Sequence, residues 1–227
     1  MSKRQATHGR LPRLTLGEIS GRNLDTEAAR SLVGLFLADG RLCKVPGPTR
    51  PQIRAVLEGG VGEIDFLQEK VDELLRALPR KAGKSQSPEI RPYQTSTRDS
   101  GNTTTVLRFR MCDTRLHLIY NLLYPAGRRQ ITTQALDLLG GRAAAWLWAE
   151  GARPDKDGWT LKRAGDTEAE AALLASWLRL LTGAEADVIK PGTKPRLRLD
   201  APQAALAQSA LLPYAPVSRR HLFVPAP

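Results

Sequence analysis

The spacing of hydrophobic and polar positions changes several times along the chain, which predicts a mixed α+β protein. Apolar residues recur three or four positions apart, as on one face of a helix, in four segments: 63–78, 114–123, 167–181 and 202–212. Alternating or β-branched patterns, typical of strands, occur in seven segments: 41–45, 52–57, 89–97, 103–110, 157–163, 186–190 and 196–200. A small helix is expected around residues 131–139.

Two further segments are almost entirely apolar and end in an acidic residue. Residues 31–40 read SLVGLFLADG, and residues 143–151 read AAAWLWAEG. Both are far shorter than the ~20 apolar residues that span a bilayer, so they belong inside a protein. Each run ends in alanine, an acid and glycine, which delivers Asp39 in the first copy and Glu150 in the second.

Small residues in these two segments favour close helix packing. Glycine in the middle of a helix lowers helix stability by roughly 1 kcal/mol relative to alanine. The presence of Gly34 would be explained by the close approach of another helix backbone. Ala144 and Ala145 take its place in the second copy. We therefore expect a helix pair with two acids at its base. The alternative for the first copy is a buried helix with a solvated Asp39. In either case Gly40 is expected in the left-handed conformation of a helix C-terminus.

The predicted elements repeat in order, as helix, two strands, helix, two strands, helix. The second copy lacks a clear strand after residues 157–163, so we expect a shortened sheet there. The expected organisation has five parts: a flexible basic arm (1–22), a first half (23–123), a connector (124–139), a second half (140–223) and a tail (224–227). The arm either touches phosphates or is simply a tail.

The positive net charge indicates that the binding partner is a polyanion. The 227 residues carry 34 Lys+Arg against 23 Asp+Glu, a net charge of +11, which favours nucleic acid first and an acidic membrane second. The sequence contains no predicted amphipathic basic helix, which argues against a role at a membrane surface. The excess of arginine over lysine suits phosphate and guanine contacts, or reflects a GC-rich genome.

Cys43 and Cys112 lack metal-ligand spacing, so neither a zinc site nor a disulfide framework is expected. No signal peptide is evident, which predicts a soluble, intracellular protein in cytoplasm, nucleoid or organelle matrix.

The two acid-ended segments resemble the motifs of the LAGLIDADG homing endonucleases, in their single-chain, two-motif form. The first copy matches the signature at six positions: Leu32, Gly34, Leu35, Ala38, Asp39 and Gly40. The second copy matches at Trp146, Glu150 and Gly151. Flanking residues 119–131, 157–161 and 212–216 are also similar to the family, and the resemblance covers residues 24–223.

This resemblance implies an α+β fold of two pseudo-symmetric αββαββα halves, with antiparallel, saddle-shaped sheets packed through the two motif helices. It also implies a monomeric, site-specific double-strand DNA endonuclease of a mobile genetic element, with a long target site and Mg²⁺, or Mn²⁺ as a substitute. Two metal-bound acids suit in-line attack on a phosphodiester, because metals activate water and neutralise the leaving oxygen. The metal site implied comprises Asp39, Glu150 and the neighbouring Ala38 and Ala149.

The chain departs from the family pattern at several of these positions. Glu150 stands where aspartate is usual and adds one methylene, which puts activity at the second site in doubt. The other acid of the motif, normally dispensable, is replaced by Leu37 and Ala149. Basic residues expected near the site are Arg129 in the connector and Arg220 or His221 near the C-terminus; the alternative for them is surface charge.

Basic residues also recur on the predicted strands of both halves. The DNA-binding candidates are Lys44, Arg54, Arg108, Arg110, Lys162, Arg163, Arg196 and Arg198. A groove-tracking surface would use such a set; the alternative for any one is a solvated sheet face. A second function class also stays open: a catalytically weak or inactive member that acts as an intron RNA maturase or a DNA-binding regulator. The retention of Asp39 and Glu150 favours cutting.

Overall fold

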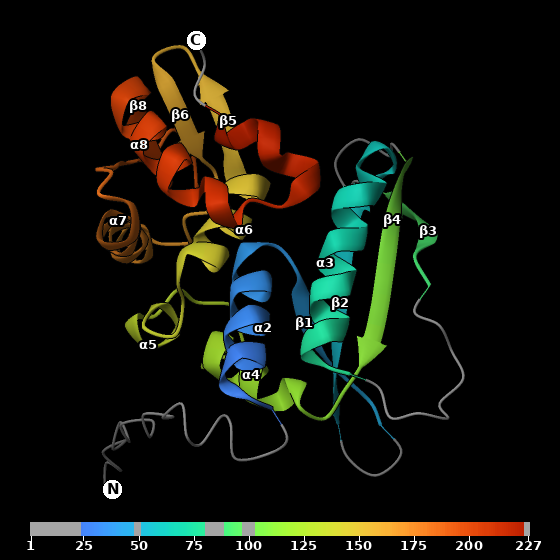
Figure 1. Ribbon diagram of the computed structural model, residues 1–227. Helices are drawn as coiled ribbons and strands as arrows, with labels where there is room; N and C mark the ends of the chain where they lie inside the picture. The colour runs from blue at the N-terminus through green and yellow to red at the C-terminus, as the bar shows by residue number, and fades with distance from the viewer. Residues whose placement is uncertain (1–23, 48–50, 80–88, 97–102, 225–227) are drawn as a thin grey trace, which may run out of the picture.

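Two units with the same order of elements pack against each other in the computed structural model, which describes residues 24–47, 51–79, 89–96 and 103–224 (Figure 1). The first unit comprises α2 (Thr26–Ala38), β1 (Arg41–Val45), β2 (Gln52–Gly60), α3 (Ile64–Ala77), β3 (Arg91–Ser96), β4 (Thr103–Cys112) and α4 (Leu116–Leu123). The second comprises α6 (Gly141–Gly151), β5 (Ala152–Asp155), β6 (Gly158–Leu161), α7 (Glu168–Thr182), β7 (Asp187–Ile189), β8 (Arg196–Asp200) and α8 (Ala201–Leu211). The predicted αββαββα repeat is confirmed.

Short helices complete the described part of the chain. They are η1 (Val61–Glu63), α5 (Thr133–Leu136) between the units, and η2 (Leu212–Tyr214) and η3 (Val217–Phe223) after α8. The predicted basic arm, residues 1–22, lies outside the described residues, as does most of the predicted tail, residues 224–227. Within the described ranges, no helix combines the length and apolar character that a membrane crossing needs.

Each unit contains an antiparallel four-stranded sheet, and the two sheets have equivalent strand orders. These are β1-β2-β4-β3 and β5-β6-β8-β7, with every neighbouring pair antiparallel. Helices cover one face of each sheet, with α3 and α4 against the first and α7 and α8 against the second (Figure 1). The other face of each sheet carries no helix among these packed elements, so each unit has one open face.

The second sheet is shorter than the first, as expected, because its strands have 3 to 5 residues against 5 to 10. The expectation of a missing strand is wrong, because β5 supplies the fourth strand. It follows α6 directly and pairs with β6, with Asp155 opposite Gly158 across the turn. Residues 152–155 carry no alternating pattern, since only Ala152 is buried and Pro154 interrupts the segment. Gly158 has a φ of 155° and meets the Leu199 carbonyl so closely that a side chain would not fit. The predicted strand 157–163 therefore begins at a turn.

Helix α2 is buried on all sides at its C-terminal end, from Leu32 to Ala38. Its N-cap is Asp25, whose Oδ1 accepts the Ala28 N–H at 2.7 Å. The helix contacts α6, α3 and α4, which together enclose it. A helix that is apolar around its whole circumference requires this central position, and the two units consequently meet along α2 and α6 (Figure 1).

The glycines of the first motif have different structural reasons. A Cβ added at Gly34 would lie 2.7 Å from Cβ of Ala143, so close approach of the two helices is confirmed. Ala143 makes this contact, rather than the predicted Ala144 and Ala145. Gly40 is not left-handed, and that expectation is wrong. A Cβ at Gly40 would instead lie 2.6 Å from Cδ1 of Phe36, which leaves no room for a side chain.

A buried carboxylate joins three helices at the N-terminal end of α6. Glu73 on α3 is 3% exposed, and it accepts hydrogen bonds from Ser31 on α2 at 2.6 Å and from Arg76 at 2.5 Å. Arg142 of α6 also donates to Glu73. Buried charges persist where they are paired in this way, so Glu73 fixes the relative position of α2, α3 and α6.

We predict that Gly34→Ala lowers the free energy of unfolding, because the new methyl group would overlap Ala143. Overpacking of this kind costs about 1–3 kcal/mol, more than the roughly 1 kcal/mol that alanine gains over glycine in a helix. The measurement is urea denaturation followed by circular dichroism. The control is Gly62→Ala, where no atom lies within 4 Å of the new Cβ.

A double variant separates overlap from other causes. Gly34→Ala combined with Ala143→Gly exchanges the two residues and should recover part of the lost stability. A Gly34→Ala protein that unfolds at the same urea concentration as the parent would show that the helices are not in contact at this point.

Candidate functional site

Asp39 and Glu150 meet at the base of the α2–α6 pair, where both bind the side chain of Lys70. The Lys70 Nζ lies 2.8 Å from Oδ2 of Asp39 and 2.5 Å from Oε1 of Glu150. Its third partner is the carbonyl oxygen of Glu58, at 3.1 Å. The two acids are thus close enough to share one cation, and the prediction that they converge is confirmed.

The positions of the two acids follow from their helices. Asp39 is the C-cap of α2, with its N–H donated to the Leu35 carbonyl at 3.1 Å, and Glu150 lies in the last turn of α6. The helix dipole disfavours a carboxylate at a C-terminus. Both acids therefore require a compensating cation, and Lys70 supplies it.

Arg163 binds the same acid from the other unit. Its Nη1 lies 2.5 Å from Oδ1 of Asp39 and 3.2 Å from the Ala38 carbonyl. Lys70 and Arg163 thus engage both carboxylate oxygens of Asp39. Arg163 was predicted as a DNA-binding residue, and it lies at the acid pair instead of on a strand, just after the end of β6.

Arg129 of the connector also approaches the end of α2. Its Nη1 lies 3.5 Å from the Leu37 carbonyl. The connector is held in place by Glu170 of α7, whose Oε1 accepts the Ile131 N–H at 3.1 Å. Its first residue, Tyr124, accepts the N–H of Leu42 in β1 at 3.4 Å. Arg129 consequently lies on a fixed loop next to the end of α2, and its role at the acid pair stays a prediction.

The surroundings separate the acidities of the two carboxyls. Burial alone would raise the pKa of Asp39, but the charges and hydrogen bonds of Lys70 and Arg163 outweigh burial and hold it below its usual value. Burial raises the pKa of Glu150 despite Lys70, and the negative charge of Asp39 adds to this effect. As pH falls, Glu150 is therefore protonated before Asp39.

A cavity of about 430 Å³ opens beside Asp39. Its lining includes the arginines 41, 129 and 163, together with Glu58 and Tyr124. Three guanidinium groups around an otherwise acidic position favour an anion, because arginine matches the geometry of phosphate oxygens. The cavity can therefore hold a phosphate group next to the carboxylate of Asp39.

The strand register shows which basic residues lie on the open face of the first sheet. Residues paired across strands share a face, and Arg54 is paired with Cys112, Val56 with Arg110, and Glu58 with Arg108. The alternate residues, such as Phe109, are buried under the helices. Five arginines therefore lie on the open face: Arg41, Arg54, Arg91, Arg108 and Arg110.

The two arginines of β4 differ in how far they are exposed to bind a ligand. Arg108 is 9% exposed, bonds to Glu58 and stacks 3.4 Å from the ring centre of Tyr93. Arg110 is exposed and lies 5.0 Å from the same ring centre. Arg110 is thus free to meet a ligand, whereas Arg108 supports Glu58 and Tyr93.

The second sheet presents a similar face. Arg198 of β8 is paired with Thr160 of β6 and with Asp187 of β7, while Leu197 and Leu199 point into the core. Arg196 lies two residues away and therefore on the same face as Arg198. Lys162 is exposed just beyond the end of β6.

Three of the remaining candidates lie elsewhere. Lys44 is paired with Ile53, on the helix-covered side of its sheet, and its ammonium lies 5.1 Å from the ring centre of Tyr120. Arg220 and His221 are exposed on η3, and among the described residues neither contacts Asp39 or Glu150. The basic residues nearest the acid pair therefore come from α3, from the end of β6 and from the connector.

Sequence reasoning missed Lys70, the residue that links the two acids. Lys70 lies between Leu67 and Leu74 at helical spacing, within the apolar stripe of α3. A charged residue inside such a stripe indicates a buried ion pair, so this signal was present in the sequence. Arg153 was also missed; it is paired with Thr160, on the same face as Arg198, in the strand that carried no recognisable pattern.

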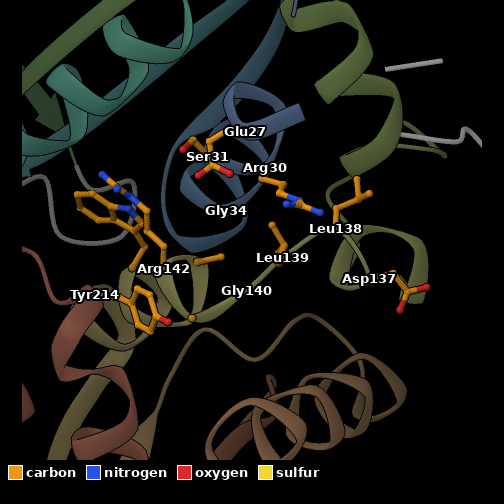
Figure 2. Close-up of a pocket in the computed structure, with 13 residues that line it drawn as sticks. Glu27, Arg30, Ser31, Gly34, Asp137, Leu138, Leu139, Gly140, Arg142 and Tyr214 are labelled. Atoms are coloured by element: carbon orange, nitrogen blue, oxygen red, sulfur yellow. The ribbon is translucent and has the colours of Figure 1, made fainter. Parts of the chain in front are cut away.

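A second cavity, of about 380 Å³, lies at the opposite end of the helix pair (Figure 2). Figure 2 shows Glu27, Arg30 and Ser31 of α2 on one side and Gly140, Arg142 and Tyr214 on the other. Tyr214 closes against Gly141, where a Cβ would lie 2.5 Å from the ring. This cavity is separate from the acid pair, because Gly34 and Ala143 meet at its inner end.

The acid pair fits a divalent metal only in part. Carboxylate oxygens are the ligands that Mg²⁺ prefers. However, both oxygens of Asp39 and one oxygen of Glu150 already contact Lys70 or Arg163. Within the described ranges, no group of three or more His, Cys, Asp or Glu side chains is arranged around a metal position. A metal would have to use the second oxygen of Glu150, or Asp39 once Arg163 moves away.

Comparison with known proteins relates this geometry to a fold. No family profile and no curated protein sequence matches the chain. Among solved structures, the homing endonuclease I-WcaI bound to its DNA recognition sequence superimposes with a TM-score of 0.69 at 13% identity, over 97% of each chain.

Two I-DmoI structures are also similar. Mesophilic variants of this homing endonuclease give a TM-score of 0.54 at 13% identity, over 82% of this chain and 91% of theirs. Its G20S variant, in complex with target DNA and 2 mM Mg, gives 0.52 at 15% identity, over 82% of this chain and 96% of that one. Together with the two motif helices and the paired antiparallel sheets, these likenesses show that the chain has the LAGLIDADG homing endonuclease fold.

Proposed function

We propose that this chain is a site-specific endonuclease that binds double-stranded DNA and hydrolyses phosphodiester bonds beside Asp39 and Glu150. The observation that carries the proposal is the meeting of the two acids, one from each unit, at the base of the α2–α6 pair. Residues 23–123 and 140–223 form the two halves in this proposal, and residues 124–139 form the connector.

The open faces of the sheets supply the DNA-binding surface. Arg54 and Arg110 lie on the first face, and Arg153, Arg196 and Arg198 lie on the second. Arginines spaced along antiparallel strands can contact both phosphates and base edges in a major groove. The net charge of +11 and the DNA-bound state of the I-WcaI neighbour support the same partner. A single chain carries both halves, so it would act as a monomer.

The cavity beside Asp39 would hold the phosphate that is cut. Arg129 and Arg163 would bind the phosphate oxygens, and Arg163 would exchange its bond to Asp39 for a bond to the phosphate. Mg²⁺ or Mn²⁺ bound by Asp39 or by Glu150, with Ala38 and Ala149 beside them, would supply an activated water and charge neutralisation. The I-DmoI neighbours crystallised with Mg or Mn support a divalent ion.

A specific observation also favours a non-cutting binder of DNA or intron RNA, such as a maturase or a regulator. Three of the four carboxylate oxygens of the acid pair are occupied by Lys70 and Arg163. A binder would use the same sheets and would keep the acids only for the helix interface. Binding and cleavage assays on one DNA site distinguish the two functions.

We predict that Arg110→Gln combined with Arg198→Gln weakens binding to duplex DNA and reduces its salt dependence. Each lost phosphate contact lowers the slope of log affinity against log salt by about one, so the double variant should lose about two. The DNA is a pool of random duplexes, from which the parent protein enriches its own site. The measurement is fluorescence anisotropy at several salt concentrations.

The control removes the same charge from helices. Arg30→Gln combined with Arg179→Gln changes two exposed arginines, on α2 and α7, that lie away from the open faces. This variant should bind with the parental slope. If the parent protein binds no duplex DNA even at low salt, the DNA-binding proposal fails as a whole.

We predict that Asp39→Asn and Glu150→Gln each slow double-strand cleavage by roughly 100-fold, the loss typical when one charged group leaves an active site. Both changes keep the shape of the side chain, so DNA binding should persist. Because Glu150 is longer and less acidic than Asp39, the parent protein should cut one strand more slowly. The measurement follows nicked and linear forms of a supercoiled plasmid that carries the enriched site, with Mg²⁺ or Mn²⁺.

The outcomes separate three cases. Equal rates on both strands would contradict the asymmetry while leaving the endonuclease in place. A plasmid that is bound but never cut, with either metal, would make the chain a binder. Loss of binding in the Asp39→Asn protein would instead indicate a structural role for that acid.

A further inference from the structure

Lys70 has the surroundings of a fixed, fully coordinated cation. Its side chain is 2% exposed, and an ammonium group has three N–H donors. The structure provides three acceptors: Asp39 at 2.8 Å, Glu150 at 2.5 Å and the Glu58 carbonyl at 3.1 Å. A buried charge is tolerated where every donor has a partner and the counter-charges are close. A movement of the Lys70 side chain would therefore break hydrogen bonds without forming better ones.

Lys70 reaches the acids from the protein interior. It lies on α3, which packs against α2 and β2, and its Nζ is 4.8 Å from the ring centre of Phe66. Phe66 in turn stacks on Trp146 of α6, with ring centres 5.7 Å apart. Both rings are buried, so an ammonium that withdrew toward them would exchange its three polar partners for apolar surroundings.

Arg163 differs from Lys70 in this respect. It is 38% exposed and lines the cavity beside Asp39, so it approaches the acid from the open side. An exposed guanidinium exchanges one anionic partner for another at little cost. The acid pair thus has one permanent cation, on its inner side, and one that a DNA phosphate can draw away.

The position of Lys70 is the one that a shared metal would take. A divalent ion held by both acids must lie between their facing oxygens, within the ~2.0–2.1 Å that Mg²⁺ keeps from its ligands. The facing oxygens are Oδ2 of Asp39 and Oε1 of Glu150, and both bind Nζ of Lys70. Two cations cannot occupy this position together, because their mutual repulsion is strong at such separations.

We propose that Lys70 permanently replaces a shared metal between Asp39 and Glu150, so that this chain holds no divalent ion by both acids at once. The inference rests on the proposed cleavage site, and it assigns that site a built-in cation. Any metal that serves the reaction then belongs to one acid at a time, on the open side of the pair. The electrostatic balance of the pair is also maintained without metal, since two carboxylates face one ammonium and one guanidinium.

Titration with Mn²⁺ in the absence of DNA tests the proposal without relying on cleavage. Electron paramagnetic resonance measures free Mn²⁺ in solutions of the full chain. The parent protein should show no site that is lost both in Asp39→Asn and in Glu150→Gln. Lys70→Met should gain one Mn²⁺ site at least about tenfold tighter than any parental site, because a positive charge leaves the position. That new site should disappear when either acid is also changed to its amide.

A matched variant excludes a general effect of charge. Lys156→Met removes one lysine charge from an exposed turn between β5 and β6, away from the acids, and should leave Mn²⁺ binding unchanged. Circular dichroism establishes that Lys70→Met is folded. If it is not, the parental titrations still decide the question, because a parental Mn²⁺ site that requires both acids overturns the proposal.

The remaining outcomes are equally decisive. A folded Lys70→Met protein that gains no Mn²⁺ site overturns the proposal, since the acids then lack the geometry to share an ion. These results are independent of the function proposed above. A chain that fails to bind DNA can still show the gained metal site, and a chain that binds and cuts DNA can still lack it.

Discussion

The close approach of α2 and α6 is the constraint on which the rest of the structure depends. Gly34 has no side chain because Ala143 occupies that space, and the two helix axes are consequently near enough for their C-terminal acids to share a partner. A bulkier residue at either position would separate the helices at their crossing. The separation would lengthen the contacts of the acid pair and also those of Glu73, because both sets of contacts connect the same helices.

The same contact brings like charges together, and the protein resolves this conflict with a lysine from a third helix. Two carboxylates at helix C-termini repel one another and are disfavoured by the helix dipoles. Lys70 compensates both effects from within, while Arg163 compensates Asp39 from the other unit. The chemistry available at the site is therefore determined as much by α3 as by the two motif helices that carry the acids.

Much of the fold could be predicted because its signals are local. The apolar stripes of α3 and α7 and the β-branched run of β4 have clear periodicity, and the two acid-ended runs indicated their own pairing. The strand β5 could not be predicted in this way, since four residues with one buried side chain have no period. Gly40 was misinterpreted because a helix-ending glycine usually relieves backbone strain, whereas here it makes room for Phe36 and Leu57.

Lys70 shows why the site was harder to predict than the fold. Its position in the stripe of α3 could have identified a buried charge, but its partners lie 31 and 80 residues away in the sequence. Such a pairing is a property of the three-dimensional arrangement and leaves no trace in local spacing. The same holds for Arg163, whose bond to Asp39 crosses between the two units.

The junction at Glu73 has a consequence for recombination between related proteins. Its ligands come from α2, α3 and α6, so one carboxylate depends on residues encoded on both sides of the connector. Lys70, on the same helix, likewise binds one acid from each unit. A hybrid that joined the first half of this chain to the second half of another protein would deprive two buried charges of α3 of one partner each, Glu73 of Arg142 and Lys70 of Glu150. Exchange of single sheets, with the three central helices kept together, preserves every one of these contacts.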